Sequence, residues 1–328
     1  MTRKKPFNVR HYVHSVTYRY HSNRWRWSPS FYVGTEIPID RPIFLLGTQG
    51  AGLTLLSRIL QRHEDVVTTT GGSSYWTGSD EMHNLLFGLL PKDYSWHHVP
   101  AQGENHNGIF ATDNLLPLYA RGRDYIDEGA AQQYRKRLQG VLRMHGATPA
   151  TPKRFLDKSQ TNSLRVGLLD ATLAGADPHY FLMLRNPFVM IWRATSGYGV
   201  LGSLPISEEE RLGLAIQHWR NLYEAALAEE KRSRLLVLRY EDFLATPETT
   251  VRAVCDFAEL TFDPAMMPQK GDRMPLGSAP DARKGFKWYP IRPANNAKHL
   301  AKLPDWARDQ IAAHCAPLIE RFGYGPDA

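Results

Sequence analysis

The 328-residue sequence lacks long apolar runs, and it contains only two cysteines. No apolar run approaches the roughly 20 residues that a helix needs to cross a membrane, so we predict no transmembrane segment. Basic residues near the N-terminus are followed by no apolar stretch, and we expect no secretory signal there. Cys255 and Cys315 lie far apart and form neither a disulfide framework nor a metal pair. We therefore expect two reduced, buried thiols in a cytoplasmic protein.

Acidic residues are fewer than basic ones, 33 against 40, which leaves a formal net charge of +7. An excess of positive charge favours an anionic partner, such as a nucleotide, an acidic glycan, a nucleic acid or a membrane surface, without choosing among them. The histidines and cysteines form no cluster with the spacing of metal ligands, so we expect no metal ion.

Three short apolar runs, at 43–46, 180–184 and 235–238, predict buried strands. Each run is continuous rather than alternating, which is typical of parallel strands that are covered on both faces. Helical patterns lie between the runs. The sequence therefore predicts an α/β fold, a three-layer sandwich around a central, mostly parallel sheet. We expect this domain to span 41–328.

Local signals predict the start of several helices. An apolar stripe at 53–60 follows a glycine turn. Ser207 and Glu210 form a capping box, and Thr246 is a predicted helix cap. Residues 71–150 are rich in Gly, Asn, Pro and His. We interpret them as insertions over one end of the sheet, where open α/β sheets bind their ligands.

The first 40 residues differ from the rest, because basic and aromatic residues alternate along them. We predict a separate N-terminal extension over 1–40. One interpretation is a hairpin or extended arm packed on the domain. The other is an arm that contacts an anionic ligand or a lipid headgroup.

A glycine-rich loop follows the first predicted strand. Gly47 and Gly52, with four residues between them, precede Thr54 at the spacing of a phosphate-binding loop. The main-chain N–H groups of such a turn, with the positive end of the next helix, bind an anion without a side-chain cation. An ordinary tight strand–helix turn is the alternative. The residues expected to line the cradle are Gly47, Thr48, Gln49, Gly50, Ala51, Gly52, Leu53 and Thr54.

Leu53 occupies the position at which a nucleotide triphosphatase carries its lysine. Chemistry at a terminal phosphate needs a cation at the β- and γ-phosphates and an aspartate-held magnesium ion. We find no strand that ends in a clear magnesium-binding aspartate. A kinase or GTPase is therefore disfavoured, and a donor with less charge at its 5′ end suits this loop better.

Several segments, in the same order, resemble the sulfotransferases that use 3′-phosphoadenosine 5′-phosphosulfate (PAPS). PIFLLGTQGAGLTLLSRILQRHEDV resembles their 5′-phosphosulfate loop, and YFLMLRNPFVMIWRATSGYG resembles their second motif, a strand followed by Arg-Asp-Pro or Arg-Asn-Pro. LLVLRYEDFLATPETTVRAVCDFAEL is similar to their strand–Tyr-Glu-Asp-Leu–helix segment. FLDKSQTNSLRVGLL and LPDWARDQIAAHCAPLIERFGYG are similar to the segment before the second motif and to the closing helix.

The resemblance implies which residues bind PAPS. Arg185 directly follows the second strand and would bind the 3′-phosphate, to which a guanidinium donates two parallel hydrogen bonds. Arg193 stands where the family has a serine that shares this phosphate. It either binds the phosphate as a second cation or faces solvent. A loop with Arg283, Lys284 and Gly285 is similar to the element that closes over the nucleotide in the cytosolic branch.

The resemblance also marks a difference at Gly50, where the family usually carries an arginine or a lysine that neutralises the leaving group. Lys158 is our candidate for the catalytic cation that replaces it. Arg58 is a second candidate. The alternative interpretation of Lys158 is a plain surface lysine, and Arg58 ranks below Lys158 as a candidate.

Attack on the sulfur also needs a base for the acceptor's proton. The position of the family's glutamate falls near Thr70 or Gly71, neither of which is acidic. Glu81 is our first candidate, since burial beside aromatic residues would raise the pKa of its carboxyl group into a useful range. A capping or surface role explains it equally well. The other candidates are Asp80, His83, His97 and His98.

The sequence as a whole predicts a PAPS-dependent sulfotransferase that acts on a hydroxyl or amine of a glycan, a lipid or a small molecule. We expect no metal and no nucleic-acid partner. A catalytically inactive anion- or glycan-binding protein on the same scaffold is the first alternative, and a nucleotide kinase is the second. Neither the acceptor nor the oligomeric state follows from the sequence.

Overall fold

The computed structural model describes residues 36–68, 100–101, 104–105, 109–196, 201–269, 291 and 296–325. At its centre lies a five-stranded sheet with the order β2-β5-β1-β6-β7. These strands are β1 (Ile43–Leu46), β2 (Val66–Val67), β5 (Arg154–Asp157), β6 (His179–Leu184) and β7 (Arg234–Arg239). All neighbouring pairs are parallel. A separate antiparallel pair consists of β3 (Pro100–Ala101) and β4 (Glu104–Asn105).

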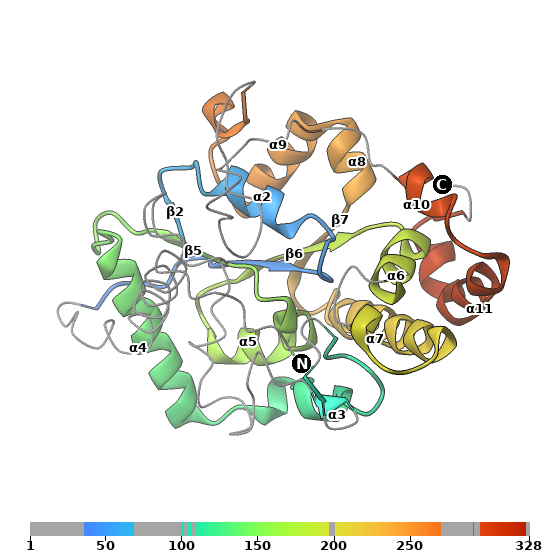
Figure 1. The fold of residues 1–328 in the computed structure, drawn as a ribbon. Coiled ribbons are helices and arrows are strands. Elements are labelled where there is room, and N and C mark those ends of the chain that lie inside the picture. The colour runs from blue at the N-terminus through green and yellow to red at the C-terminus, as the bar shows by residue number, and fades with distance from the viewer. Residues whose placement is uncertain are drawn as a thin grey trace, which may run out of the picture.

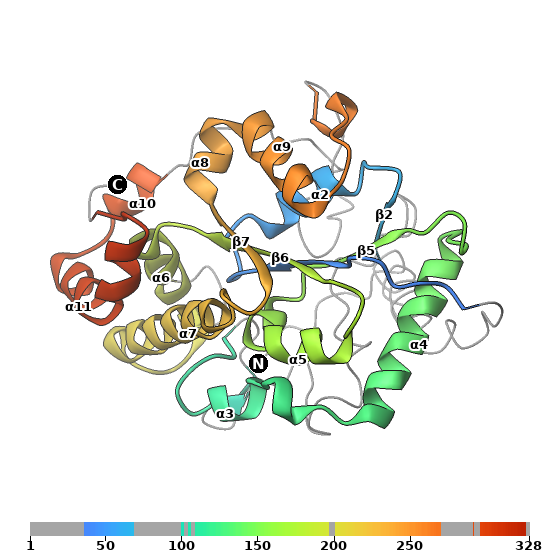
Figure 2. The ribbon, with the colours of Figure 1, turned by 180° about the vertical axis from the view of Figure 1, so that it is seen from behind.

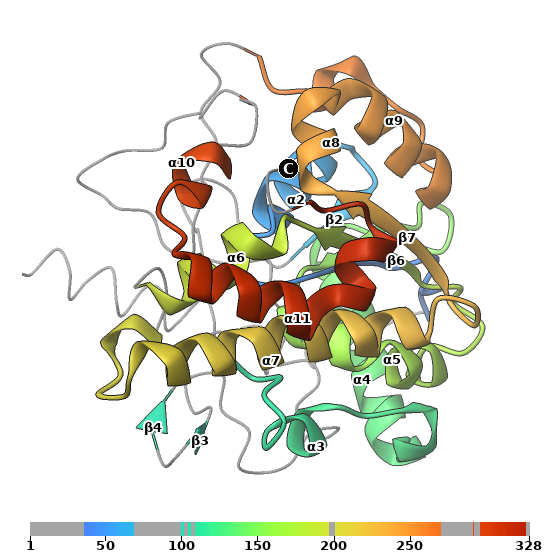
Figure 3. The same ribbon diagram turned by 90° about the vertical axis from the view of Figure 1, so that its right-hand side faces the viewer.

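Helices cover both faces of the sheet, so the predicted three-layer sandwich is confirmed (Figures 1 and 2). One face carries α2 (Leu53–Leu60), α8 (Tyr240–Ala245) and α9 (Pro247–Ala258). The other carries α4 (Glu128–Met144), α5 (Val166–Thr172), α6 (Pro187–Thr195) and α7 (Glu208–Ala228). Beside α6 and α7 lie α10 (Asn296–Leu300) and α11 (Asp305–Arg321), as Figure 3 shows. The short elements are α3 (Leu116–Tyr119) and the 3₁₀ turns η3 (Arg123–Tyr125), η4 (Gln160–Leu164), η5 (Leu201–Ser203) and η6 (Pro264–Met266).

The central strands feed two cores, one on each face of the sheet. Ile43 and Leu45 of β1 pack toward α2 and α9. Phe44 and Leu46 pack toward the face with α4 and α7. All four side chains are fully buried. This double coverage explains the continuous apolar run, since neither face of the strand meets water.

The edge strand β7 is covered on both faces, as expected, since Leu235 and Val237 pack against one core and Leu236 and Leu238 against the other. Most of its residues are only half-buried. Among the described residues, it has a strand neighbour on one side alone. Coverage on both faces therefore holds for all three runs, and 235–238 differs only in being less deeply buried, because continuity of an apolar run does not tell a central strand from an edge strand.

Two predicted helix starts have different outcomes. Helix α7 begins with the expected capping box, in which Ser207 Oγ accepts from the Glu210 N–H and the Glu210 carboxylate accepts from the Ser207 N–H. Thr246 does precede α9, but its hydroxyl donates to the carbonyl of Asp242 at 3.2 Å and does not cap α9. Thr246 therefore occupies the predicted N-cap position of α9, and only the expected side-chain hydrogen bond is wrong.

The interpretation of 71–150 as insertions is also wrong in part. Helix α4 lies within it and is a layer of the fold, since Tyr134 and Leu138 reach the main core. At the other boundary, Ile37 is 2% exposed and belongs to the same core. Residues 1–35 lie outside the described residues, and the division of the chain at residue 40 stays a prediction.

Two further expectations concern the membrane and the thiols. Among the described residues, every helix is too short or too polar to cross a bilayer. Cys255 and Cys315 are free and buried, as predicted. Burial raises the pKa of the Cys255 thiol to about 11 and that of the Cys315 thiol to about 12. Both thiols are therefore protonated at neutral pH.

Candidate functional site

The glycine loop, residues 47–52, connects the carboxyl end of β1 to α2, at the edge of the sheet where open α/β proteins bind ligands. Gly47 and Gly52 have φ angles of 142° and 104°, which L-residues rarely adopt. A Cβ atom at Gly52 would lie 2.4 Å from the ring of Tyr240, and one at Gly47 would lie 2.7 Å from the carbonyl of Met183. Both positions therefore require glycine, and the turn is closely packed from behind.

The main-chain amides of the loop differ in what they contact. The Gly47 N–H donates to Ser163 Oγ at 3.0 Å, and the Ala51 N–H donates to the Thr48 carbonyl at 3.1 Å. Leu53 and Thr54 open α2, and the first N–H groups of a helix have no acceptor within it. The amides of Leu53 and Thr54, at the positive end of α2, are thus placed to receive an anion.

The hydroxyl of Thr48 anchors the loop to the layer beneath it. It lies 3.4 Å from the Tyr223 hydroxyl, which donates to the Met183 carbonyl at 2.9 Å. Burial raises the pKa of Tyr223 to about 12, so this phenol keeps its proton. The contacts join the loop to α7 and to β6, and they fix the start of the turn.

Arg185 directly follows β6, the neighbour of β1 in the sheet. Its Nη1 donates to the carbonyl of Gly50 at 3.0 Å, and its guanidinium carbon lies 4.6 Å from the centre of the Tyr240 ring. Arg185 is only 7% exposed. The structure thus holds a buried guanidinium against the glycine loop, between a main-chain carbonyl and an aromatic face.

Arg193 lies on α6 in the same positive neighbourhood as Arg185. The pKa of His299, on α10, is lowered by its burial and then by the charges of Arg193 and Arg185. Lys298 and Lys302 add to the same effect. Several cations from α6, α10 and the end of β6 therefore concentrate positive potential on one region.

Lys158 follows β5, the other neighbour of β1, so it lies at the same edge of the sheet as the loop. It is only 5% exposed, although lysine is rarely buried. The residue before it, Asp157, accepts from the Ser159 N–H at 2.8 Å, from Ser159 Oγ at 2.7 Å and from Asn162 Nδ2 at 2.9 Å. These bonds fix η4, the turn that carries Ser163 to the loop.

Asp157 corrects the prediction that no strand ends in a clear magnesium-binding aspartate. A strand next to β1 does end in a buried aspartate, which is where nucleotide triphosphatases hold magnesium. The carboxylate of Asp157, however, is bonded to its own turn through Ser159 and Asn162. Leu53 supplies no cation for a terminal phosphate. A nucleotide kinase stays disfavoured on both grounds.

The remaining predicted residues divide into one that faces elsewhere and several that are not described. Arg58 is on α2 and donates from Nη1 to Gln61 at 3.0 Å, at the end of the helix remote from the loop. This contact favours Lys158 over Arg58 as the replacing cation. Outside the described residues lie Asp80, Glu81, His83, His97, His98, Arg283, Lys284 and Gly285.

A cluster of Asp177, His179 and Glu259 has the spacing of a metal site, with all ligand atoms within 4.8 Å of one another. It lies at the amino ends of the strands, opposite the loop. Arg154 contacts His179 Nδ1 at 3.1 Å. A guanidinium only donates, so Nδ1 accepts and Nε2 carries the proton. Arg234 also donates to Asp177 and Glu259, at 2.7 and 2.8 Å. These contacts indicate an ion-pair cluster rather than a metal centre.

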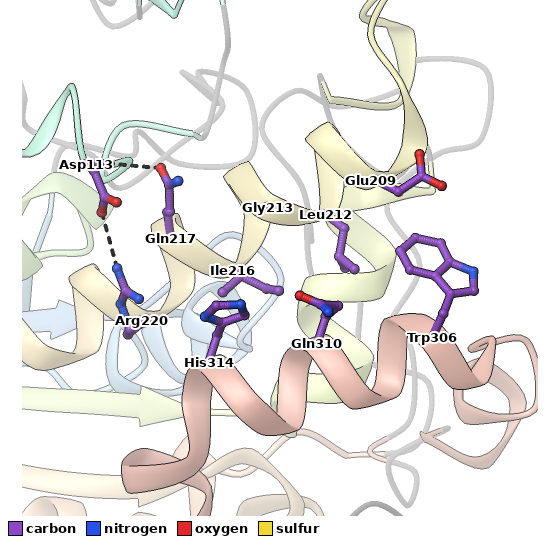
Figure 4. Close-up of a pocket in the computed structure, with 10 residues that line it drawn as sticks. All are labelled: Asp113, Glu209, Leu212, Gly213, Ile216, Gln217, Arg220, Trp306, Gln310 and His314. Atoms are coloured by element: carbon purple, nitrogen blue, oxygen red, sulfur yellow. Dashed lines mark hydrogen bonds and ion pairs between the residues drawn. The ribbon is translucent and has the colours of Figure 1, made fainter.

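A surface groove of about 490 Å³ lies between α7 and α11 (Figure 4). Its walls include Ile216 of α7 and Trp306 of α11. At one end Arg220 donates to Asp113 at 3.2 Å, so these opposite charges neutralise each other. Neither the glycine loop nor Arg185 lines this groove, so it is separate from the candidate anion site.

Known proteins share this architecture. The model of the Sulfotransferase family matches residues 42–264, a segment that includes the loop and Arg185. The fold is similar to that of the sulfotransferase domain of the olefin synthase from Synechococcus PCC 7002, with 19% identity, a TM-score of 0.50, and coverage of 89% of this chain and 98% of that one. It is also similar to a sulfotransferase from Mycobacterium avium, with 15% identity, a TM-score of 0.50, and coverage of 94% and 82%. No curated protein sequence matches the chain.

Proposed function

The chain belongs to the sulfotransferase family, and from this premise we propose that it transfers a sulfuryl group from PAPS to a hydroxyl or amine of an acceptor. The main support is the contact of Arg185 with the glycine loop, 3.0 Å from Nη1 to the Gly50 carbonyl. An anion cradle and a buried guanidinium at adjacent strand ends suit a donor that carries one anionic group at its 5′ position and another at its 3′ position.

Each anionic group of the donor has a separate partner in this proposal. The amides of Leu53 and Thr54 bind the 5′-phosphosulfate at the positive end of α2. Arg185 binds the 3′-phosphate, with Arg193 as a second cation; the shared positive neighbourhood of the two arginines supports this pairing. The loop of Arg283, Lys284 and Gly285 is proposed to close over the nucleotide.

Transfer then proceeds by in-line displacement. The acceptor oxygen or nitrogen forms a bond to sulfur while the bond from sulfur to the bridging oxygen breaks. The electron pair of that bond leaves with adenosine 3′,5′-bisphosphate. Lys158 stabilises the charge that develops on the bridging oxygen, as supported by its burial at the end of β5. Glu81 takes the acceptor's proton, and no metal takes part.

Two assays test the proposal. Calorimetry should show that adenosine 3′,5′-bisphosphate binds without magnesium and more tightly than ATP with magnesium. Transfer of labelled sulfate from PAPS should then be measured on a panel of glycans, phenols and lipids. Bisphosphate binding without transfer to any acceptor would favour the inactive binding protein. Preference for ATP with magnesium would favour the kinase and overturn the proposal.

The acceptor and the cellular location extend the proposal. A carbohydrate is one candidate acceptor, beside a lipid and a small molecule, and the panel above tests these classes against one another. We also propose a reducing, cytoplasmic location, supported by the two buried thiols that form no disulfide. Fractionation of cells that express the full chain would show whether it enters the cytoplasmic fraction.

A further inference from the structure

Three distant segments of the chain meet at the carboxylate of Glu241. Its Oε1 accepts from the Asn186 N–H at 3.0 Å and from Asn296 Nδ2 at 2.8 Å. Its Oε2 accepts from the Tyr324 hydroxyl at 3.1 Å. One side chain thus connects the turn after β6 with α10 and with the residues that follow α11.

The Asn186 contact acts directly on the backbone next to Arg185. Asn186 also caps α6, since its Oδ1 accepts from the Val189 N–H at 3.2 Å. The residue before Glu241, Tyr240, places its ring under the Arg185 guanidinium and against Gly52 of the loop. The pair Tyr240–Glu241 therefore fixes both the side chain and the main chain of the arginine.

The C-terminal partners of Glu241 are buried and held by further contacts. Asn296 and Tyr324 are 6% and 2% exposed, and the Arg239 guanidinium lies 4.6 Å from the centre of the Tyr324 ring. Burial first, and then the charge of Glu241, raise the pKa of Tyr324, so its hydroxyl keeps the proton that it donates. Both partners lie beyond residue 264, where the match to the family model ends.

A negative charge beside an anion site opposes anion binding by simple electrostatics. Glu241 nevertheless lies close to the arginine assigned to the 3′-phosphate, because its carboxylate accepts from the N–H of Asn186, the residue that follows Arg185. Its role at this place is therefore geometric. The bond to Asn296 also holds α10, which carries Lys298, one of the cations of this region.

We propose that Glu241 is a positioning residue that sets Arg185 for the donor's 3′-phosphate and makes donor binding depend on the C-terminal segment 296–325. This inference rests on the proposed function, because it takes the 3′-phosphate as the ligand of Arg185. The geometry assigns the dependence to two contacts outside the family match, those of Asn296 and Tyr324.

Calorimetry on the full chain tests the inference with two ligands, adenosine 3′,5′-bisphosphate and adenosine 5′-monophosphate, which lacks the 3′-phosphate. Glu241→Ala should weaken bisphosphate binding by about tenfold, and Tyr324→Phe by about threefold, because charge-assisted hydrogen bonds are lost. Monophosphate binding should change by less than about twofold. Glu248→Ala removes an equal charge from an exposed ion pair on α9 and should change neither affinity.

The direction of the change in bisphosphate affinity distinguishes a positioning role of Glu241 from a simple effect of its negative charge. Loss of a nearby negative charge would by itself tighten binding of the bisphosphate. Tighter or unchanged bisphosphate binding in Glu241→Ala and Tyr324→Phe would overturn the inference, and so would an equal loss for both nucleotides. If Glu241→Ala does not fold, Tyr324→Phe gives the same comparison with the carboxylate intact.

A second readout is independent of the donor. If the unmodified protein binds neither nucleotide, the proposed function fails, and crystal structures of the unmodified protein and of Tyr324→Phe then decide on Glu241. A positioning role predicts that Arg185 Nη1 moves beyond hydrogen-bonding distance of the Gly50 carbonyl in the variant. An unchanged contact at 3.0 Å would overturn the inference.

Discussion

Arg185 and Gly50 lie just beyond the carboxyl ends of the neighbouring strands β6 and β1, and Nη1 of the arginine donates to the glycine carbonyl at 3.0 Å. Gly50 has a φ angle of 89°, a conformation that favours glycine over a residue with a charged side chain. It is also the position where the family that the sequence resembles carries a cation. Positive charge therefore stands at this point of the loop although the loop itself supplies none.

Removal of this guanidinium should weaken donor binding strongly. We expect Arg185→Ala to lower the affinity for adenosine 3′,5′-bisphosphate by about 100-fold, because a bidentate contact to a dianion is lost. Arg252→Ala, which removes an exposed arginine from an ion pair on α9, is the matched control and should leave the affinity unchanged. Calorimetry measures both. Equal affinities for Arg185→Ala and the unmodified protein would remove Arg185 from the site.

Gly52 should tolerate no side chain. Gly52→Ala combines an unfavourable φ of 104° with a Cβ atom 2.4 Å from the Tyr240 ring, and we expect a loss of roughly 2–3 kcal/mol in the free energy of unfolding. Gly213→Ala is the contrasting control, since no atom lies within 4 Å of a Cβ atom there. It should stabilise helix α7 by about 0.5–1 kcal/mol. Urea unfolding gives both values, and equal effects would contradict this view of the loop.

Lys158 should act on the chemical step more than on binding. We expect Lys158→Met to lower kcat by about 100-fold with little change in the KM for PAPS, because a cation at the leaving oxygen acts mainly in the transition state. Lys153→Met, which removes a lysine paired with Asp65 at 3.0 Å, is the control. Steady-state kinetics with a responsive acceptor separates the two constants. An unchanged kcat would exclude Lys158 as the replacing cation.

Acid should destabilise the fold through two buried histidines. Burial lowers the pKa of His218 to about 3, and burial together with Arg234 and Arg154 lowers that of His179 to about 4. In the unfolded chain both titrate near pH 6.5, so stability is complete above about pH 6.5 and declines as pH falls toward 4. Each histidine should contribute roughly 2 kcal/mol to the loss between pH 7 and 4.5.

A variant isolates the contribution of His218. Its Nδ1 accepts from the Ala111 N–H at 3.1 Å, and the Oδ1 atom of His218→Asn can take over this bond without a titrating group. Urea unfolding at pH 7 and 4.5 should show a smaller pH dependence in the variant. An unchanged pH dependence would mean that His218 does not remain neutral in the folded protein.

Local patterns in the sequence predicted the parts of the fold that local physics determines. The apolar runs at 43–46 and 180–184 became β1 and β6 because both faces of these strands are buried. The loop glycines were recognisable because positive φ angles restrict the residue type. Strand β5 was missed, since Arg154 and Asp157 leave only two apolar residues between them.

The contacts that complete the site could not be predicted in the same way. Ser163 reaches Gly47 across 116 positions of the chain, and Glu241 reaches Tyr324 across 83. The local sequence around these residues does not indicate their partners, because only the packing of β5, β6 and α11 brings the contacting residues together. The sequence offered Lys158 and Arg58 as candidates for the cation that the loop lacks. The structure shows that Arg185 also contacts the loop.

The most direct test of the account is a crystal structure of the protein with adenosine 3′,5′-bisphosphate bound. The account predicts the 5′-phosphate within hydrogen-bonding distance of the Leu53 and Thr54 amides and the 3′-phosphate on the Arg185 guanidinium. A bisphosphate bound elsewhere, or a glycine loop that stays empty at saturating ligand, would contradict it.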